Sequence, residues 1–395
     1  MAKKNQNHKS VDEESDDLIF AVCELFFKRI VCTSNENSDG GKKKARGSVG
    51  AAAVAEEISK KFNRADINRE RIYPLLWEAI KRKFLIMNVP AHIKLRDKIV
   101  SKFNLSEYLY QNDGQIIVVN SSIGDLAEHV NAKAANVVVS LIDSVSEKKK
   151  ARNLDDDDDN ARVHLGFGAG YAAEKVAKIL PAQTASKTPK LTLHALTSGG
   201  QYLAGQQKAP TTYFSFFEGK VQDAKFIGMF TPTVVLGDEY ETLENNPSYR
   251  SVRNIRDDID ILVTSLAWAE DEHGLLKEYY SHLVENKLVK EDVFKELKNE
   301  GWVGDVMFLP YSKEKAIESQ TLKFVTLFNF NELCEFSKKP DKYVVVTCAP
   351  CNKCDKQKTE AVRPLLENPN LRMWTHLIID RPTAEELVGD YAEDE

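Results

Sequence analysis

The sequence has no long hydrophobic run and is poor in the residues that mark fibrous proteins. No stretch approaches about 18 consecutive apolar residues, the length that a membrane-spanning helix needs. The first residues are polar and lack the apolar segment of a secretory signal peptide. Glycine (19 of 395 residues) and proline (13) are too scarce for a collagen-like or low-complexity chain. We therefore expect a globular cytoplasmic protein of about two domains, without a membrane partner.

Cysteine is scarce as well, and the spacing of the six cysteines does not resemble a secreted disulfide framework. Reduced thiols are the expectation. Cys348, Cys351 and Cys354 form a run whose spacing can present three thiolates to a metal ion. The candidates for a fourth ligand, if the fold brings them near, are Cys334, Asp355 and His376. Unliganded thiols are the favoured interpretation and no cofactor is expected, with zinc the favoured metal if the run binds one.

Negative charge prevails over the whole chain but not locally. Asp and Glu outnumber Lys and Arg by 60 to 54, a net charge of −6, which argues against a uniformly basic nucleic-acid-binding protein. Residues 42–96, however, hold 14 Lys and Arg against 5 Asp and Glu, a net charge of +9, so the rest carries −15. This asymmetry predicts a small basic module attached to a larger acidic body.

Two predicted helices in the basic segment form a helix-turn-helix pattern. Val54, Ile58 and Phe62 lie on one face of a helix over residues 51–62, and a second helix is predicted over 67–85. A short turn between two helices, the second with a basic exposed start, is typical of DNA-binding modules. We therefore expect the second helix to enter the major groove of double-stranded operator DNA.

The residue types near the second helix suit this role, since arginine pairs with guanine and asparagine with adenine. The candidate base-reading residues are Asn68, Arg69, Arg71 and Tyr73. The candidate phosphate-contacting residues are Lys60, Lys61, Lys81, Arg82 and Lys83. Pro74 lacks an amide donor, so the helix could instead begin there and shift the reading residues. Because paired modules read half-sites, a homodimer or homotetramer is expected.

From residue 105 onward, strand-like and helix-like segments alternate. Strands are predicted at 115–120, 163–168, 191–196, 233–236, 259–264, 342–347 and 373–379, and helices at 123–144 and 172–180. This rhythm predicts an α/β domain with a mostly parallel sheet. The predicted organisation is a disordered tail (1–17), a helix-turn-helix DNA-binding domain (18–92) and an effector-binding domain (93–392) with a charged loop insertion near 146–160.

With these pieces in order, the chain resembles the SorC-type bacterial transcriptional regulators that respond to sugars. The stretches that carry the resemblance are 67–85, similar to the recognition helix, 95–105, similar to the linker, 131–138, similar to an Ala-Ala helix, and the glycine loop 164–170. The resemblance implies a winged-helix or helix-turn-helix domain followed by a domain akin to ribose-phosphate isomerase and glucosamine-phosphate deaminase. It also implies a phosphorylated sugar at the carboxyl edge of the sheet.

The residues that the resemblance assigns to the effector are Gly166, Phe167, Gly168, Ala169, Gly170, Ser198, Gly199, Gly200, Asp305 and Lys358. Glycines after a strand let backbone amides approach an anion at the start of a helix, and Lys358 would add a positive charge. The same glycines could serve only a tight turn. Two later stretches, Ser265-Leu-Ala and Cys348-Ala-Pro, stand where the family has glycines.

The sequence thus predicts a sequence-specific DNA-binding regulator, not an enzyme, whose operator affinity is modulated by a sugar phosphate. One alternative is a sugar-phosphate isomerase or deaminase with a helical appendage, and another is a diverged regulator without an effector. The basic N-terminal segment argues against the enzyme. Asp271-Glu272-His273 is its only candidate acid/base cluster, and we interpret it as a helix cap and solvent-facing turn.

Overall fold

The computed structural model describes residues 14–35, 50–82, 90–121, 125–152, 161–184, 189–198, 208–237, 239–287, 292–319 and 321–389. The chain divides into two compact units, residues 1–88 and 89–395. The sequence places this boundary at residue 92, but Ala91 pairs with Val119, so the chain packs on the second unit before that point. None of the helices in the described ranges combines the length and apolar character needed to cross a bilayer.

The described part of the first unit consists of helices α1 (Asp16–Asn35), α2 (Ala51–Phe62) and α3 (Arg69–Lys81). All three contribute buried apolar side chains to one core, among them Ile19, Ile58 and Ile72. Residues 14–35 and 50–82 contain no strand, so the wing implied by the resemblance is not among them. The helix α1 also begins inside the predicted tail, of which residues 1–13 lie outside the described part.

The turn between α2 and α3 sets where the second helix begins. Asn63 ends α2 in the left-handed conformation (φ 53°), which asparagine tolerates. Asn68 caps α3 by accepting a hydrogen bond from the Arg71 amide at 3.0 Å. The helix therefore starts at Arg69, and not at Pro74, which lies inside it on an exposed side.

The second unit is built on a mostly parallel sheet, as the alternating pattern predicts. Its parallel strands, in spatial order, are β1 (Gln115–Val119), β11 (His376–Asp380), β10 (Tyr343–Cys348), β6 (Ile261–Trp268), β2 (Val163–Phe167), β3 (Leu191–Ala195) and β4 (Lys225–Ile227). An antiparallel extension on β6 consists of β7 (Gly304–Val306) and β8 (Leu309–Tyr311). The predicted strand at 233–236 lies elsewhere, because β5 (Val234–Leu236) pairs with β9 (Leu322–Phe324) in a separate small sheet.

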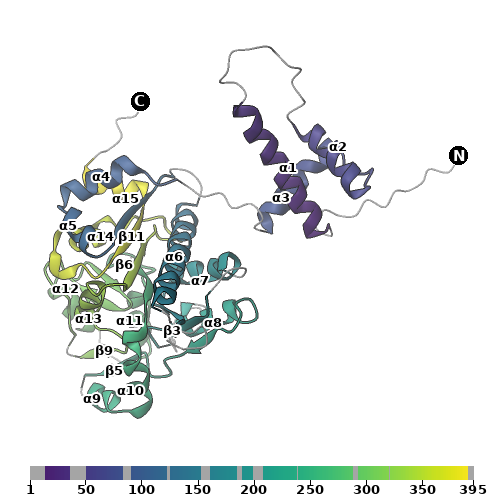
Figure 1. Ribbon diagram of the computed structural model, residues 1–395. Coiled ribbons are helices and arrows are strands. Elements are labelled where there is room, and N and C mark those ends of the chain that lie inside the picture. The colour runs from purple at the N-terminus through teal and green to yellow at the C-terminus, as the bar shows by residue number, and fades with distance from the viewer. Residues whose placement is uncertain are drawn as a thin grey trace. The chain divides into compact units, whose positions relative to one another are not determined.

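Helices cover both faces of the sheet because alternate strand residues point to opposite sides. Ile378 of β11 joins one core cluster, and its neighbours Leu377 and Ile379 join another. The first cluster is covered by α6 (Leu126–Ala151), α7 (Tyr171–Thr184) and α8 (Pro210–Phe217). The second is covered by α4 (Ile93–Lys102), α13 (Phe330–Ser337), α14 (Thr359–Glu367) and α15 (Arg381–Val388). Helices α6 and α7 lie side by side (Figure 1).

The remaining described α-helices are α5 (Ser106–Gln111), α9 (Tyr240–Glu244), α10 (Pro247–Asn254), α11 (Leu275–Glu285) and α12 (Asp292–Asn299). One prediction in this unit is wrong in part: residues 146–151 form the last turns of α6 and not a loop. Their lysines have fixed partners, since Lys148 bonds to Asp341 at 2.8 Å and Lys149 to Asp260 at 2.7 Å. Residues 153–160 lie outside the described part.

Candidate functional site

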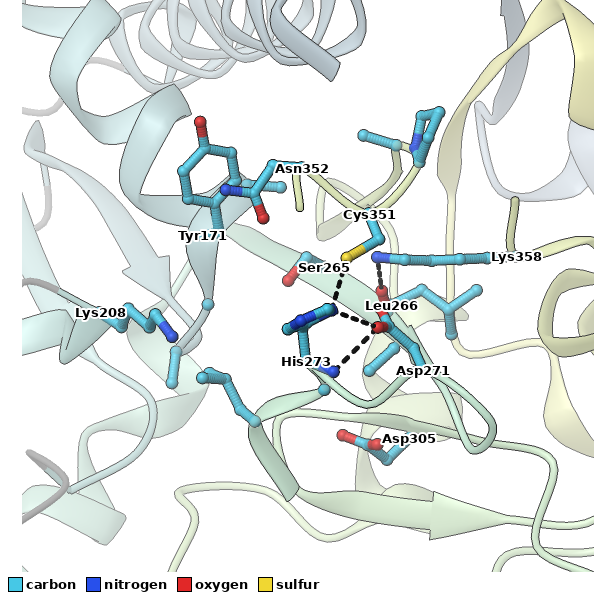
Figure 2. A pocket seen from close by; sticks show the side chains of 18 of the residues that line it. Tyr171, Lys208, Ser265, Leu266, Asp271, His273, Asp305, Cys351, Asn352 and Lys358 are labelled. Carbon is cyan, nitrogen blue, oxygen red and sulfur yellow. Dashed lines mark hydrogen bonds and ion pairs between the residues drawn. The ribbon is translucent and has the colours of Figure 1, made fainter. Parts of the chain in front are cut away.

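A cavity of about 90 Å³ lies where β2, β6 and β10 end, at the carboxyl edge of the sheet (Figure 2). A parallel sheet places the loops after neighbouring strands together at this edge, where ligands bind in open α/β folds. Here the loops after three adjacent strands supply most of the lining. Since a bound water needs about 10–15 Å³, the cavity has room for a small polar ligand.

Three helices begin at the cavity. Helix α7 starts at Tyr171, α11 at Leu275 and α14 directly after Lys358, and all three residues line the cavity. The first amides of a helix have no partner within the helix, and the helix dipole places partial positive charge there. The convergence of three such ends favours an anionic ligand.

Basic side chains add to this positive field. Lys358 donates one hydrogen bond, from Nζ to the Leu266 carbonyl oxygen at 2.7 Å. An ammonium group carries three hydrogens, so two more can serve a ligand. Lys208 also lines the cavity and forms an ion pair with Glu278 at 3.1 Å. Figure 2 shows Lys208 and Lys358 on opposite sides of the cavity.

Asp305 is an acidic residue of the cavity wall whose pKa is raised from its ordinary value. Burial raises the pKa of Asp305 to about 7, with a further contribution from Asp271 and an opposing one from Lys358. The raised pKa favours the protonated form of this carboxyl group. It can then donate a hydrogen bond to a ligand, and it opposes an anion less than a fully charged carboxylate would.

The glycines of the 164–170 loop serve packing more than anion binding. The Gly168 amide already donates to the Val263 carbonyl oxygen at 2.9 Å, and the Gly170 amide donates to the Tyr213 hydroxyl at 3.2 Å. Gly170 has a φ of +138°, and a Cβ there would lie 2.6 Å from the Ser265 Oγ. The turn interpretation thus accounts for these glycines, while the positive charge at the cavity comes from helix ends and lysines.

The structure separates the predicted effector residues into three groups. Those that line the cavity are Ala169, Gly170, Asp305 and Lys358. Those in the described part that do not line it are Gly166, Phe167, Gly168 and Ser198. Gly166 is packed against Leu196 and Leu262, where a Cβ would come within 2.8 Å of both side chains, and the Ser198 hydroxyl bonds to the Thr231 carbonyl. Gly199 and Gly200 lie outside the described residues.

Sequence reasoning did not assign several lining residues to this site: Tyr171, Lys208, Ser265, Asp271, His273, Cys351 and Asn352. The signal for some of them was present, because they directly follow predicted strands. Asp271 is buried and faces the cavity, so the interpretation of residues 271–273 as a solvent-facing turn is wrong for Asp271, while Glu272 is exposed as predicted. The partner of Asp271 in the cavity wall is His273, whose Nδ1 lies 3.5 Å from the Cys351 Sγ.

The structure does not bring the predicted three-cysteine set together. Cys348 ends β10 inside the hydrophobic core, and burial raises the pKa of its thiol to about 12. Cys334 is also buried and its thiol donates to the Asn370 carbonyl oxygen at 3.5 Å. His376 lies at the first residue of β11, away from the carboxyl edge. Cys351 and Cys354 instead lie close to Asp271 and His273.

In the first unit, the start of α3 exposes Asn68, Arg69 and Tyr73, as predicted. Arg71 is different: its side chain is 11% exposed and forms ion pairs with Glu14 and, at 3.5 Å, with Asp66. The prediction that Arg71 faces outward is therefore wrong. Its guanidinium joins the start of α1 to the α2–α3 turn, because the burial of a charge requires opposite charge nearby.

The predicted phosphate-contacting residues also differ among themselves. Lys61 is exposed, and Lys60 is exposed but paired with Glu56 at 2.7 Å. Arg82 forms ion pairs with Glu78 at 2.9 Å and Asp16 at 2.8 Å. The side chain of Lys81 and all of Lys83 lie outside the described residues. Trp77, which sequence reasoning did not single out, is 66% exposed on α3.

The comparison with known proteins gives matches among solved structures only. No protein-family model and no curated protein matches the chain. The full-length sorbitol operon regulator SorC from Klebsiella pneumoniae is 14% identical, with a TM-score of 0.58 over 95% of this chain and 100% of that chain. A DeoR family transcriptional regulator from Listeria monocytogenes is 16% identical, with a TM-score of 0.53 over 75% of this chain and 98% of that chain.

A third match is the putative sugar-binding domain of a transcriptional repressor from Vibrio fischeri. It is 13% identical, with a TM-score of 0.52 over 75% of this chain and 98% of that chain. These matches share the α/β architecture of the second unit, and the full-length regulator extends the agreement to nearly the whole chain. The resemblance seen in the sequence is thus confirmed at the level of the fold: this chain has the fold of SorC-type transcriptional regulators.

Proposed function

We propose that the protein is a DNA-binding transcriptional regulator whose operator affinity changes when a phosphorylated sugar binds the cavity of the second unit. The observation that carries the proposal is the convergence of three helix N-termini and Lys358 on one cavity. The fold of transcriptional regulators, one of them described as a sugar-binding domain, supports it.

The cavity suits both parts of such a ligand. The phosphate group would lie near the N-terminus of α7 and the ammonium groups of Lys208 and Lys358. Sugar hydroxyls would bond to Asn352 and to Asp305, which can donate as well as accept when protonated.

For DNA, the exposed start of α3 is the reading surface that the structure favours. Arg69 would reach a base edge in the major groove, with Tyr73 and Trp77 on the same exposed side and Lys61 near the phosphates. Two such modules are needed for a pair of half-sites, so the functional form in this proposal is a homodimer or homotetramer. Ultracentrifugation of the full-length chain measures that state.

The ligand is tested by thermal unfolding of the full-length protein with a panel of phosphorylated sugars. Each is paired with its unphosphorylated sugar, and inorganic phosphate is included. A ligand at a thousandfold its Kd stabilises by about 4 kcal/mol, which raises the Tm by several degrees. The proposal predicts this shift for one phosphorylated sugar. No shift with any member of the panel would contradict it and favour a regulator without an effector.

DNA binding is tested by selection of bound duplexes from a random-sequence library with the same full-length protein. The expected result is enrichment of a sequence with two related half-sites, and a change in affinity when the phosphorylated sugar is added. Binding without enrichment, or affinity that the ligand does not change, would contradict the proposal.

The enzymatic alternative is favoured by one observation, the raised pKa of Asp305 beside Lys358 and Asp271. Carboxyl groups with a pKa near 7 are suited to acid–base catalysis. NMR spectra of the sugar phosphate incubated with the protein separate the two functions. Isomerisation or deamination that disappears in Asp305→Asn would establish an enzyme, and an unchanged sugar phosphate that alters DNA affinity would establish the regulator.

A further inference from the structure

Four side chains with metal-binding atoms meet at one wall of the cavity. Asp271 and His273 belong to the turn between β6 and α11, and Cys351 and Cys354 belong to the loop between β10 and α14. Their ligand atoms all lie within 4.8 Å of one another. Figure 2 shows Asp271, His273 and Cys351 pointing toward one another. The cluster unites a carboxylate, an imidazole and two thiols from segments distant in sequence.

The two shortest known separations in the cluster are close to those of a tetrahedral ion. His273 Nδ1 lies 3.5 Å from Cys351 Sγ and 3.4 Å from Asp271 Oδ1. Zinc bonds are about 2.3 Å to sulfur and about 2.0–2.1 Å to nitrogen and oxygen. At tetrahedral angles these lengths separate nitrogen from sulfur by about 3.6 Å and nitrogen from oxygen by about 3.3 Å. Both measured distances agree with these edges.

The backbone holds the two thiols in place. The Cys351 amide donates to the Lys356 carbonyl oxygen at 3.0 Å, and the Asp355 amide donates to the Cys351 carbonyl oxygen at 2.8 Å. The Cys-x-x-Cys loop is therefore a compact turn that presents both sulfurs to one point.

The other two residues of the cluster, Asp271 and His273, are held by a hydrogen bond within their turn. Asp271 is buried, and its Oδ1 accepts a hydrogen bond from the His273 backbone amide at 2.9 Å. Cys351 is buried as well, whereas Cys354 is exposed and gives an ion access from solvent. A buried charge requires compensation, and a divalent cation would offset two of the three negative charges of two thiolates and a carboxylate.

We propose that Asp271, His273, Cys351 and Cys354 bind one zinc ion. Two sulfur donors exclude magnesium and calcium, which prefer oxygen, and four protein ligands make a closed structural site. The ion links the turn after β6 to the loop after β10, two segments that wall the cavity, and so fixes the distance between them. The proposed ion needs neither the sugar nor DNA to bind, although Asp271, His273 and Cys351 also line the cavity.

The test uses the full-length protein, purified under reducing conditions without chelator and then loaded with Zn²⁺ or Co²⁺. Elemental analysis is expected to give about one zinc per chain. The cobalt form should show a thiolate-to-cobalt charge-transfer band and the intense visible absorption of tetrahedral cobalt. Because this spectrum is measured on the wild-type protein, the test remains decisive even if a variant fails to fold.

Variants then identify the ligands. Cys351→Ser, Cys354→Ser and His273→Gln should retain less than about 0.1 metal per chain. Cys348→Ala is the matched control: it removes the third cysteine of the run, which lies in the core, and should retain full metal content. Circular dichroism confirms that each variant is folded.

Three results would overturn the proposal. One is reduced wild-type protein that binds neither Zn²⁺ nor Co²⁺, or whose cobalt spectrum lacks the thiolate band. Another is metal loss in Cys348→Ala equal to that in Cys351→Ser, which would transfer the site to the three-cysteine run. A Cys351–Cys354 disulfide, detected by mass after alkylation in the protein as purified under reducing conditions, would also replace the metal site by a redox pair.

Discussion

Lys358 donates a hydrogen bond from its ammonium group to the Leu266 carbonyl oxygen at 2.7 Å. This contact joins the start of α14 to β6, two segments of the cavity wall, and places a positive charge in the cavity. The same residue thus has a structural partner and hydrogens left for a ligand. The hydrogen bond to Leu266 does not depend on the ligand, whereas the contact with a phosphate does, so ligand titrations can separate the two roles of Lys358.

Lys358→Met should weaken binding of a phosphorylated sugar about tenfold or more, since a hydrogen bond to a charged group contributes about 1.5–3 kcal/mol. The affinity for selected DNA in the absence of the sugar should not change. Calorimetric titration of the full-length variant measures the first quantity. Lys313→Met removes an exposed lysine outside the cavity and should leave the sugar affinity unchanged. Equal affinities of wild type and Lys358→Met would remove Lys358 from the ligand site.

Arg69 and Arg71 should respond differently to substitution, although they are two residues apart. Arg71→Ala should destabilise the first unit by about 2 kcal/mol, because it removes the Arg71–Glu14 ion pair from a largely buried position. Hydrogen exchange of residues 51–81 in the full-length protein measures this loss. If these residues exchange as slowly in Arg71→Ala as in wild type, the Arg71–Glu14 ion pair does not contribute to the stability of the first unit.

Arg69→Ala should leave this exchange unchanged and lower the affinity for selected DNA about tenfold or more, as expected for loss of a base contact. Fluorescence anisotropy with the selected duplex measures the affinity. Lys60→Ala, which removes an exposed lysine already paired with Glu56, is the matched control and should have a smaller effect. Undiminished DNA affinity in Arg69→Ala would mean that the start of α3 is not the reading surface.

Asp305 should make the protein less stable as the pH rises. Its pKa is raised to about 7 in the folded state, so its favourable contribution is complete below its ordinary value near 3.8 and is lost as pH rises through 7. Asp305→Asn keeps the neutral form at every pH. The Tm of the variant relative to wild type should therefore increase between pH 5 and pH 8.

Asp257→Asn is the control for this titration, because the pKa of Asp257 is lowered where that of Asp305 is raised. Lys339 lowers the pKa of Asp257, so its contribution is present above its ordinary pKa and is lost only as pH falls through the lowered value. Its Tm difference from wild type should show no trend between pH 5 and 8. If the Tm difference between Asp305→Asn and wild type is the same at every pH from 5 to 8, the raised pKa of Asp305 is contradicted.

Gly170→Ala should destabilise the protein and disturb the cavity. A residue with φ of +138° is strained unless it is glycine, and the new Cβ would lie 2.6 Å from Ser265 Oγ. Gly219→Ala is the control at an open position, since no atom lies within 4 Å of the added Cβ and its φ of +68° is close to values that other residue types in this chain adopt. Gly170→Ala should cost more, by about 1–3 kcal/mol.

The Ser265→Ala background checks the cause of this difference. Removal of Oγ relieves the close contact, so Gly170→Ala should cost less there than in the wild-type background, as measured by urea denaturation. Equal costs in both backgrounds would show that backbone conformation, and not contact with Ser265, makes glycine necessary.

Much of the fold could be predicted from the sequence because it depends on local patterns. The spacing of Val54, Ile58 and Phe62 indicates α2, and apolar runs such as 342–347 indicate buried strands. The sequence indicates the ends of these elements less well. Helix α6, for example, continues through Lys148–Lys150, because Lys148 and Lys149 pair with acidic residues on other segments.

The candidate site could be predicted only in part. Asp305 and Lys358 follow from the resemblance, and both line the cavity. Arg71 shows the limit in the first unit, since nothing in the sequence indicates that Glu14 would cover its guanidinium. An arginine near the start of an amphipathic helix can face water or a neighbouring helix, and the packing of α1 decides which.

The sequence by itself determined the order of the helices and strands, because periodicity and capping act between residues close along the chain. Only the tertiary structure decided which loops share the carboxyl edge of the sheet. His273 and Cys351 are 78 residues apart, yet the pairing of β6 with β10 brings them to 3.5 Å. Strand order depends on the packing of the whole domain, and the cavity, its charge and the proposed zinc ligands all follow from it.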